Sequence, residues 1–481
     1  MKRAASFRIL LVTFAFVLAA AGTNAQGNSA SDQPAGSPAS TPSGGQNSFS
    51  GSVPSQPVPG VLALSLQDAI DRGLKQNLGV LLSSSDVNSA AGQRWQQLAS
   101  ILPHLSASPY VDVSQVNLAE FGFHFSAPGF SVPSVVGPFS YFDARVNFSD
   151  SVFDWSAINK TRAANERLSS ARHTYQDARD LVVLSVGYAY LQTIAAEARV
   201  DTAQAQVDTA QALYNQAADQ VSAGTSPQID GLRAEVELKT RQQQLIAAKN
   251  DVDIQKLSLA RTIGLAPGQQ FNLTDKSPYS PFEGMTVDEA LKRAYASRSD
   301  FQAAMADFRA AEYAKRAAQA ERYPTLSLTA DYGAAGQHPS TNSHGVFDVR
   351  GTLSIPIFQG GAARGDIAVA DAQLQQSRER LESLRGQIDA DVRTALLNLQ
   401  SAQDQVDVAR SNIALAQQTL SQARDRFSAG VTDTVEVVQA QEAVASANEN
   451  YISSLYSYNY AKISLARALG TAEEGVKEFF K

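Results

Sequence analysis

Two carboxylates lie beside a glycine-centred turn near the C-terminal end of the chain. Asp433 and Glu436 follow the turn that Gly430 begins. Gly430 suits the left-handed conformation in which helices end, and Thr432, Asp433 and Thr434 offer oxygens that can cap a following helix. Carboxylates at this place could attract cations and repel anions, or they could simply favour the positive end of the next helix. The residues alone leave both interpretations open.

The remaining chemically active residues argue against catalysis and metal binding. The chain has no cysteine, which excludes disulfides and thiolate sites. No histidine stands in a metal-ligand spacing, and all five are expected to be structural or exposed: His104, His124, His173, His338 and His344. No catalytic triad, carboxylate-lined cleft or phosphate loop is visible. We therefore expect no enzyme activity, no cofactor and no metal.

The N-terminus is typical of an exported protein. Three basic residues and a short apolar core predict a signal peptide over residues 1–25. Its removal takes the formal net charge from −7 to −10, which disfavours nucleic-acid binding. Residues 26–60 are rich in Ser, Gly and Pro and predict a disordered linker. Without cysteine, no lipid anchor is expected.

Four segments alternate apolar and polar residues with the period of a strand, at about 104–116, 140–150, 325–335 and 346–355. No apolar run after the signal peptide is long enough for a transmembrane helix. The polar face of the return strands carries two charged pairs, which are Asp143 with Arg145 and Asp348 with Arg350. This face would be the surface of a soluble sandwich or the water-lined interior of an outer-membrane barrel. Four strands cannot close a barrel alone.

Two long helices, expected over 154–222 and 359–428, lead to the turns. At 1.5 Å per residue, each is about 100 Å long. Both carry an apolar seam with steps of three and four residues, the signature of a coiled coil. The two seams are 206 residues apart and consist of Val200, Ala203, Val207, Ala210, Tyr214, Ala217 and Val221, and of Val406, Ala409, Ile413, Ala416, Leu420, Ala423 and Phe427. The matching offsets predict a tandem duplication.

Each half is expected to begin with a helix that a capping Ser65 or Thr286 starts and that runs to Pro103 or Pro324. The loops between paired strands differ. The first, around 116–140, holds five phenylalanines and could be a ligand site or a self-packed surface loop; the second, around 333–345, is short and polar.

This order of elements resembles the outer-membrane efflux proteins of the TolC family over about Leu64 to Thr471. The specific parts are Pro103, Pro324, the segment SIPIFQGG at Ser354 to Gly361, and the two SAG turns. The resemblance implies a homotrimer whose protomers each give four strands to a twelve-stranded barrel. An α-helical coiled-coil barrel would continue it as a tunnel through the periplasm.

The resemblance also implies roles for the turns. Glu436 matches an acidic ring that closes the periplasmic entrance. Gln439 stands where a second acidic ring is common, and Thr432 where a locking arginine can occur. Other candidates for the lock are Asp433, Arg424, Asp425 and Arg426. Asp230 corresponds to Glu436 in the first half. The residues implied to dock a periplasmic adaptor protein are Ala223, Gly224, Thr225, Ala429 and Gly430.

The sequence thus predicts a mainly α protein with membrane strands, built from repeats at 61–266 and 286–472, a linker at 267–285 and a short tail at 473–481. The implied function is passive: an outer-membrane exit duct of a Gram-negative-type cell, in contact with outer-membrane lipid, an adaptor and an inner-membrane pump. The alternative is a soluble periplasmic coiled-coil scaffold or adaptor. The sequence does not name the cargo.

Overall fold

The computed structural model describes residues 49, 51–122, 126–127, 129–131, 133–275, 279–282, 284–338 and 341–479. The predicted signal peptide and the linker as far as residue 48 lie outside this part. The chain divides into units 1–46 and 47–481, and all described residues lie in the second unit.

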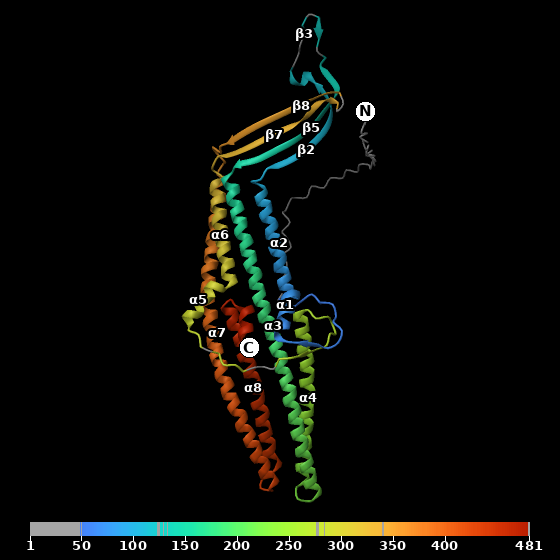
Figure 1. The fold of residues 1–481 in the computed structure, drawn as a ribbon, viewed down its shortest axis with the longest axis vertical. Coiled ribbons are helices and arrows are strands. Elements are labelled where there is room, and N and C mark those ends of the chain that lie inside the picture. The colour runs from blue at the N-terminus through green and yellow to red at the C-terminus, as the bar shows by residue number, and fades with distance from the viewer. Residues whose placement is uncertain are drawn as a thin grey trace, which may run out of the picture. The chain divides into compact units, whose positions relative to one another are not determined.

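Two helical hairpins make up most of the second unit (Figure 1). The descending helices are α3 (Trp155–Ser222) and α7 (Ala362–Ser428), and the returning helices are α4 (Gln228–Ile263) and α8 (Thr434–Ala468). Asp154 caps α3 by accepting a hydrogen bond from the Ala157 amide at 3.0 Å. The predicted uninterrupted long helices are therefore present.

The four predicted strands form one antiparallel sheet in the order β2–β5–β7–β8. They are β2 (His104–Asn117), β5 (Val135–Phe153), β7 (Thr325–His338) and β8 (Thr341–Ser354). The prediction of a polar loop around 333–345 is wrong, because β7 and β8 pair as far as His338 and Thr341. Backbone pairing in a ladder does not require apolar side chains, so a polar, glycine-containing segment can still be strand.

The helix expected before each sheet segment is in fact two helices. The first half has α1 (Leu66–Gln76) and α2 (Leu78–Ala99), and the second has α5 (Val287–Ser297) and α6 (Ser299–Ala320). The predicted capping boxes at Ser65 and Thr286 are confirmed. Asn77 and Arg298 adopt extended backbone conformations and interrupt the helices. The Asn77 amide accepts from the Gly79 N–H and donates to the Phe49 carbonyl, so a tertiary contact stabilises the break.

Three ordered segments were not predicted. Strand β1 (Leu62–Leu64) pairs in parallel with β6 (Phe271–Leu273), inside the expected linker, and α9 (Ala472–Phe479) occupies the expected tail. The end of the predicted disordered linker also lies on the body, because the Val53 and Ser55 amides donate to the carbonyls of Gln76 and Gly264. Backbone hydrogen bonds, which composition does not reveal, hold this segment.

The aromatic loop contains a 3₁₀ turn and two short strands, η2 (Leu118–Phe121), β3 (Ser126–Ala127) and β4 (Phe130–Ser131). Phe121 and Phe139 are exposed, which differs from a self-packed loop. Phe123 and Phe125 lie outside the described residues.

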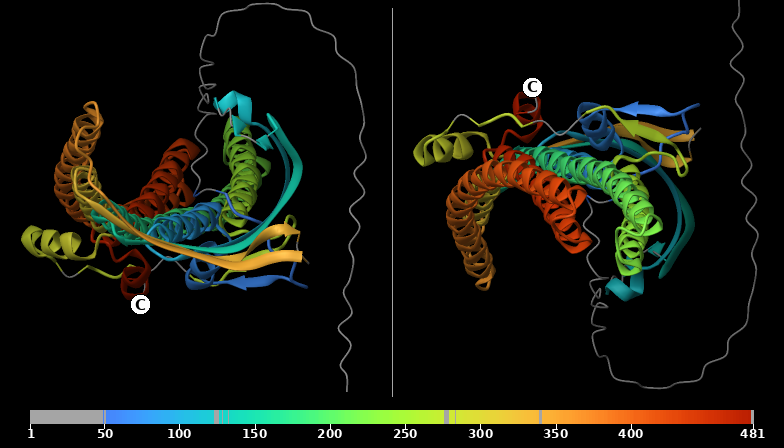
Figure 2. Two further views of the ribbon diagram at one scale, coloured as in Figure 1. Left: turned by 90° about the horizontal axis from the view of Figure 1, so that it is seen from above. Right: turned by 90° about the horizontal axis from the view of Figure 1, so that it is seen from below.

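The long helices pack as one curved layer. Toward the hairpin tips the neighbours run α4–α3–α8–α7, and toward the sheet they run α2–α3–α6–α7. Figure 2 shows α1, α5 and α9 on the convex side of this layer. Most of the predicted seam is buried, including Ala210, Ala217, Val406, Ala423 and Phe427.

One described helix, α3, contains an 18-residue window with a mean hydropathy of 1.3, of which 61% is buried inside the structure. The expectation of no such apolar run is therefore wrong. Val182, Val186 and Tyr190 from α3 pack in a core cluster with residues of α1 and β6. Length and composition alone therefore do not distinguish this largely buried helix from a membrane span.

Arg298 joins the second-half helices to each other. Its guanidinium is paired with Asp300 at 2.6 Å and Asp391 at 3.0 Å. Gly470, just after α8, packs directly on its backbone: a Cβ on Gly470 would lie 2.6 Å from the Arg298 nitrogen. Gly470 has φ +75°, as Gly430 has φ +71°, but a Cβ on Gly430 meets no described atom within 4 Å.

We predict that Gly470→Ala lowers the thermal unfolding midpoint more than Gly430→Ala. In both variants an alanine in the left-handed conformation costs about 1 kcal/mol of stability. In Gly470→Ala the new Cβ must also push the Arg298 backbone away from residue 470, which costs about 1–3 kcal/mol more. Circular dichroism at one fixed heating rate measures the difference. Equal midpoints for the two variants would contradict the packing argument.

Candidate functional site: the hairpin tips and the sheet faces

The second tip is a tight turn with a short polar network. The amides of Ala429 and Val431 donate to the carbonyls of Asp425 and Arg426 at 3.1 and 2.9 Å, which closes the end of α7. Asp433 then caps α8, accepting from the Val435 amide at 3.1 Å. This satisfies backbone groups that helix ends leave without partners. The prediction that Asp433 can cap the following helix is therefore confirmed.

Glu436, one turn into α8, is held from two directions. The Thr432 hydroxyl donates to one carboxylate oxygen, and the Arg426 guanidinium lies 3.5 Å from the other. The Glu436 side chain remains 38% exposed. Arg426, one of the residues expected as alternatives for the lock, therefore contacts Glu436 within one chain. Thr432, which stands at the position where a locking arginine can occur, contacts Glu436 through its hydroxyl.

Gln439 lies one turn further and is exposed. It lines a groove of about 370 Å³ between α4 and α8, together with Ile229, Leu232 and Val236 from α4. The structure thus places Gln439 between the two hairpins and next to the apolar edge of α4.

The first tip has the same turn but a different carboxylate environment. Gly224 has φ +72°, and the Thr225 hydroxyl donates to the Gln220 carbonyl at 3.0 Å. Asp230, the counterpart of Glu436, is only 10% exposed at its side chain and lies 3.5 Å from Arg233. A carboxylate that is buried beside an arginine is less accessible to ions in solution than an exposed one. The two tips are alike in backbone and unlike in available charge.

The residues implied to dock an adaptor share one property: each is exposed at the end of a hairpin. A Cβ on Gly224 or Gly430 would meet no described atom within 4 Å. Small residues and free space allow another protein to approach the backbone closely.

The predicted charged residues of the sheet lie on one face. On β5, Arg145 pairs with Asp143 at 2.8 Å and with Asp331 of β7 at 3.1 Å, and Asp143 is 4% exposed. On β8, Arg350 pairs with Asp348 at 2.8 Å. Sequence reasoning did not single out Asp331; the signal was its position on the polar side of the alternation in β7.

The opposite face of the sheet is apolar and open. Phe347 is 78% exposed and Leu105 is 72% exposed, with Val111, Val349 and Leu353 also exposed beside them. A continuous exposed apolar face of this kind marks an interaction site for another apolar surface.

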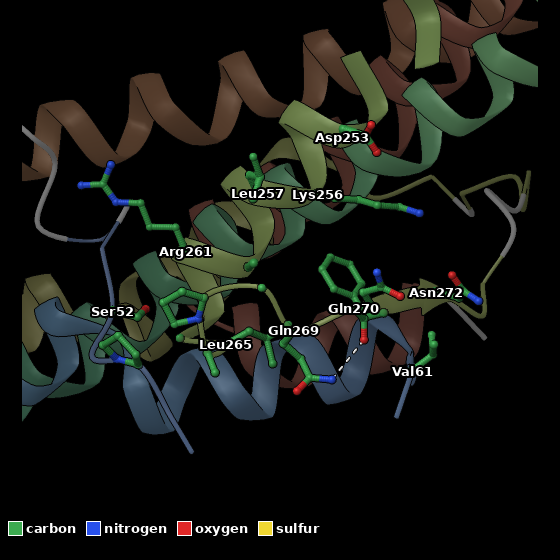
Figure 3. A pocket seen from close by; sticks show the side chains of 17 residues that line it. Ser52, Val61, Asp253, Lys256, Leu257, Arg261, Leu265, Gln269, Gln270 and Asn272 are labelled. Atoms are coloured by element: carbon green, nitrogen blue, oxygen red, sulfur yellow. Dashed lines mark hydrogen bonds between the residues drawn. The ribbon is translucent and has the colours of Figure 1, made fainter. Parts of the chain in front are cut away.

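A further cavity of about 810 Å³ lies away from the tips (Figure 3). It is formed where Ser52, Pro54 and Val61 meet the end of α4 and strand β6. Leu257 and Phe271 provide apolar walls, and Lys256, which pairs with Glu197 at 2.9 Å, stands at its edge. Within the described ranges, no group of three His, Asp or Glu residues could hold a metal ion.

Asp433 allows its capping role to be separated from its charge. We predict that Asp433→Asn keeps the thermal midpoint of the wild type, since asparagine is an equally good cap, whereas Asp433→Ala costs about 1 kcal/mol. Thermal unfolding followed by circular dichroism tests this. A loss of stability in Asp433→Asn equal to that in Asp433→Ala would mean that the charge, not the cap, stabilises the tip.

Known proteins share both the sequence and the architecture. The family described as "Outer membrane efflux protein" matches residues 74–265 and 290–471. The chain is 24% identical over 352 residues to outer membrane protein TolC of Escherichia coli, covering 69% of this chain and 70% of TolC. It is 24% identical over 434 residues to outer membrane protein OprJ of Pseudomonas aeruginosa, covering 85% of each.

The fold is also that of a solved outer-membrane protein. VceC from Vibrio cholerae superposes with a TM-score of 0.71 at 20% identity, covering 85% of this chain and 97% of VceC. The family match spans well over half of the chain in two blocks that contain the hairpins and the sheet strands. The chain therefore belongs to the outer membrane efflux protein family, and it is an efflux channel of the TolC type.

Proposed function

We propose that three copies of this chain form one exit duct, with a twelve-stranded barrel in the outer membrane and a helical tunnel in the periplasm. The observation that carries the proposal is the open sheet, which is apolar on one face and charged on the other. In a barrel the apolar face would contact lipid, and Asp143, Arg145, Asp348 and Arg350 would face water.

The edges of the sheet support assembly from several chains. In the described part of the chain, β2 and β8 each pair with a single strand. Unpaired edges in a bilayer are costly, because no water is present to satisfy the backbone. Pairing β8 of one copy with β2 of the next removes every edge and closes the barrel.

The two edges of the helical layer support the same arrangement. On α4, Ile229, Leu232 and Val236 line the groove shared with α8, and a further row of large apolar side chains is exposed beyond it, namely Ile246, Ile254 and Leu257. On α7, at the opposite edge of the layer, Leu397, Val408 and Leu415 are exposed. Packing α4 of one copy against α7 of the next would cover both rows and close a ring of helices.

The repeated architecture fits a tandem duplication with boundaries near 61–266 and 286–472. The family description matches the chain twice, and each half has two short helices, two strands and a hairpin in the same order. Two similar halves in each of three copies would place hairpins evenly around the tunnel.

The duct is proposed to conduct passively, without catalysis or a cofactor, and to work with a periplasmic adaptor and an inner-membrane pump. That the chain carries no lipid anchor stays a prediction. A soluble periplasmic scaffold is the weaker candidate, because it would leave the apolar face of the sheet in water. Detergent extraction separates the two: a trimer that needs detergent supports the duct, and full release into osmotic-shock fluid contradicts it.

In the proposed duct the second tip forms the gate, with Glu436, Asp433, Gln439 and Thr432 around the entrance. Three copies of Glu436 near the axis would attract cations. The Glu436 side chain is 38% exposed, which supports this role.

We predict that Glu436→Gln weakens block by multivalent cations added to the periplasmic side of a planar bilayer. The substitution removes one charge per copy and keeps the shape of the side chain. Glu442→Gln serves as a control, because Glu442 is an exposed glutamate further along α8. Unchanged block and ion selectivity in Glu436→Gln, with trimers of normal yield, would exclude a gate role for Glu436.

The proposed adaptor surface is tested at Gly430. We predict that Gly430→Trp reduces co-purification with the adaptor and lowers drug resistance in cells, because a bulky side chain fills the space above the turn. Gly430→Ala is the matched control, since it carries the same backbone strain without the bulk. Normal adaptor capture by Gly430→Trp would contradict docking at this tip.

A further inference from the structure

Three tyrosines gather where α3 packs against α8. Tyr456 and Tyr460 of α8 stack with ring centroids 6.3 Å apart and planes 8° apart. Tyr188 of α3 meets both rings edge-on, at centroid distances of 6.1 and 5.6 Å. We call these three residues the tyrosine cluster. Edge-to-face and stacked rings at such distances attract one another, so the cluster is a defined aromatic surface.

The cluster opens toward solvent through Tyr188, which is 44% exposed. Its neighbours along α3 show which side this is. Val182 and Val186 point to α1, because a Cβ on Gly73 of α1 would touch both. Tyr188 is two residues beyond Val186, a rotation of about 200° around the helix. Tyr188 therefore points away from α1, which lies on the convex side of the helical layer (Figure 2).

The place of α3 and α8 in the layer excludes another helix as the cover. Toward the tips, α3 lies between α4 and α8, and α8 lies between α3 and α7. The edges that a second copy would cover belong to α4 and α7. The open side of the tyrosine cluster is thus the concave face of the layer, which faces the tunnel in the proposed trimer.

An ion pair lies on the same side of the helices as the cluster. Three turns from Tyr188 toward the tip, Arg199 of α3 pairs with Glu449 of α8 at 2.9 Å, and the Glu449 side chain is 52% exposed. Arg199 is eleven residues from Tyr188, and Glu449 is seven residues from Tyr456. Both separations are close to whole numbers of helical turns, so this pair lies on the same face as the cluster.

We propose that the tyrosine cluster is a binding site on the tunnel wall for aromatic cations in transit. Ring faces attract both planar aromatic groups and positive charge. The inference rests on the proposed trimeric duct, because only a closed ring of helices makes the concave face a tunnel wall. Three copies would provide nine rings at one level of the tunnel.

The test compares two cations with purified trimer in detergent, by isothermal titration calorimetry. Tetraphenylphosphonium is aromatic, and tetrabutylammonium is a cation without rings. We expect the wild type to bind tetraphenylphosphonium more tightly, and Tyr188→Leu to lose about tenfold in affinity, the size of effect that cation–ring contacts give. Tyr188→Phe keeps the ring and should bind as the wild type does. Tyr323→Leu is the control, since Tyr323 is an exposed tyrosine outside the cluster.

Equal affinity of Tyr188→Leu and wild type for tetraphenylphosphonium, or equal binding of the two cations by wild type, would overturn the proposal. Because the chain has no cysteine, Tyr188→Cys introduces a single thiol. Its reaction with a charged, membrane-impermeant thiol reagent in the assembled trimer is expected, and no reaction would also overturn the proposal. Channel conductance in bilayers is measured on the same preparations: a chain that forms no channel contradicts the duct itself, whereas conducting trimers without aromatic preference contradict only the site.

Discussion

The rest of the structure depends on close approach between helices that form a single layer. α1 and α5 pack on the layer near the middle of the long helices. Toward the tips the layer is one helix thick, so each helix buries mainly the strip that faces its neighbour. Small side chains occupy much of that strip, including Ala203, Ala210 and Ala217 on α3 and Ala409 and Ala423 on α7. Small residues bring backbones together and increase the dispersion contacts available per turn. They also leave the concave face of the layer free, as a tunnel wall requires.

The layer needs reinforcement where its helices change partners, and partly buried ion pairs supply it. Arg298 connects α6 to α7 through Asp391, Arg467 of α8 pairs with Asp177 of α3, and Arg179 of α3 pairs with Glu473 of α9. Burial raises the pKa of Asp180, beside these pairs, to about 6. Such pairs are directional and fix one arrangement, although their net contribution to stability is small once desolvation is included.

Periodic features of this fold could be predicted from the sequence, and features created by distant contacts could not. The seams, the strands and the capping boxes at Ser65 and Thr286 follow from local spacing. The breaks at Asn77 and Arg298 depend on partners elsewhere in the fold, namely Phe49 and Asp391. Strand β1 forms only because β6 lies beside it, about 200 residues away. At the tip, sequence position located Glu436 but did not determine which neighbouring side chain would hold it.

The contacts of Glu436 bear on how the proposed gate would close. In a ring of three bare carboxylates, mutual repulsion would oppose closure. Here each Glu436 lies near Arg426 of its own chain and accepts a hydrogen bond from Thr432. The guanidinium offsets part of the carboxylate charge before three copies meet, which lowers the repulsion at the axis. At the first tip the Asp230 carboxylate is already buried beside Arg233. Only the second tip therefore combines an available charge with a local partner that can release it.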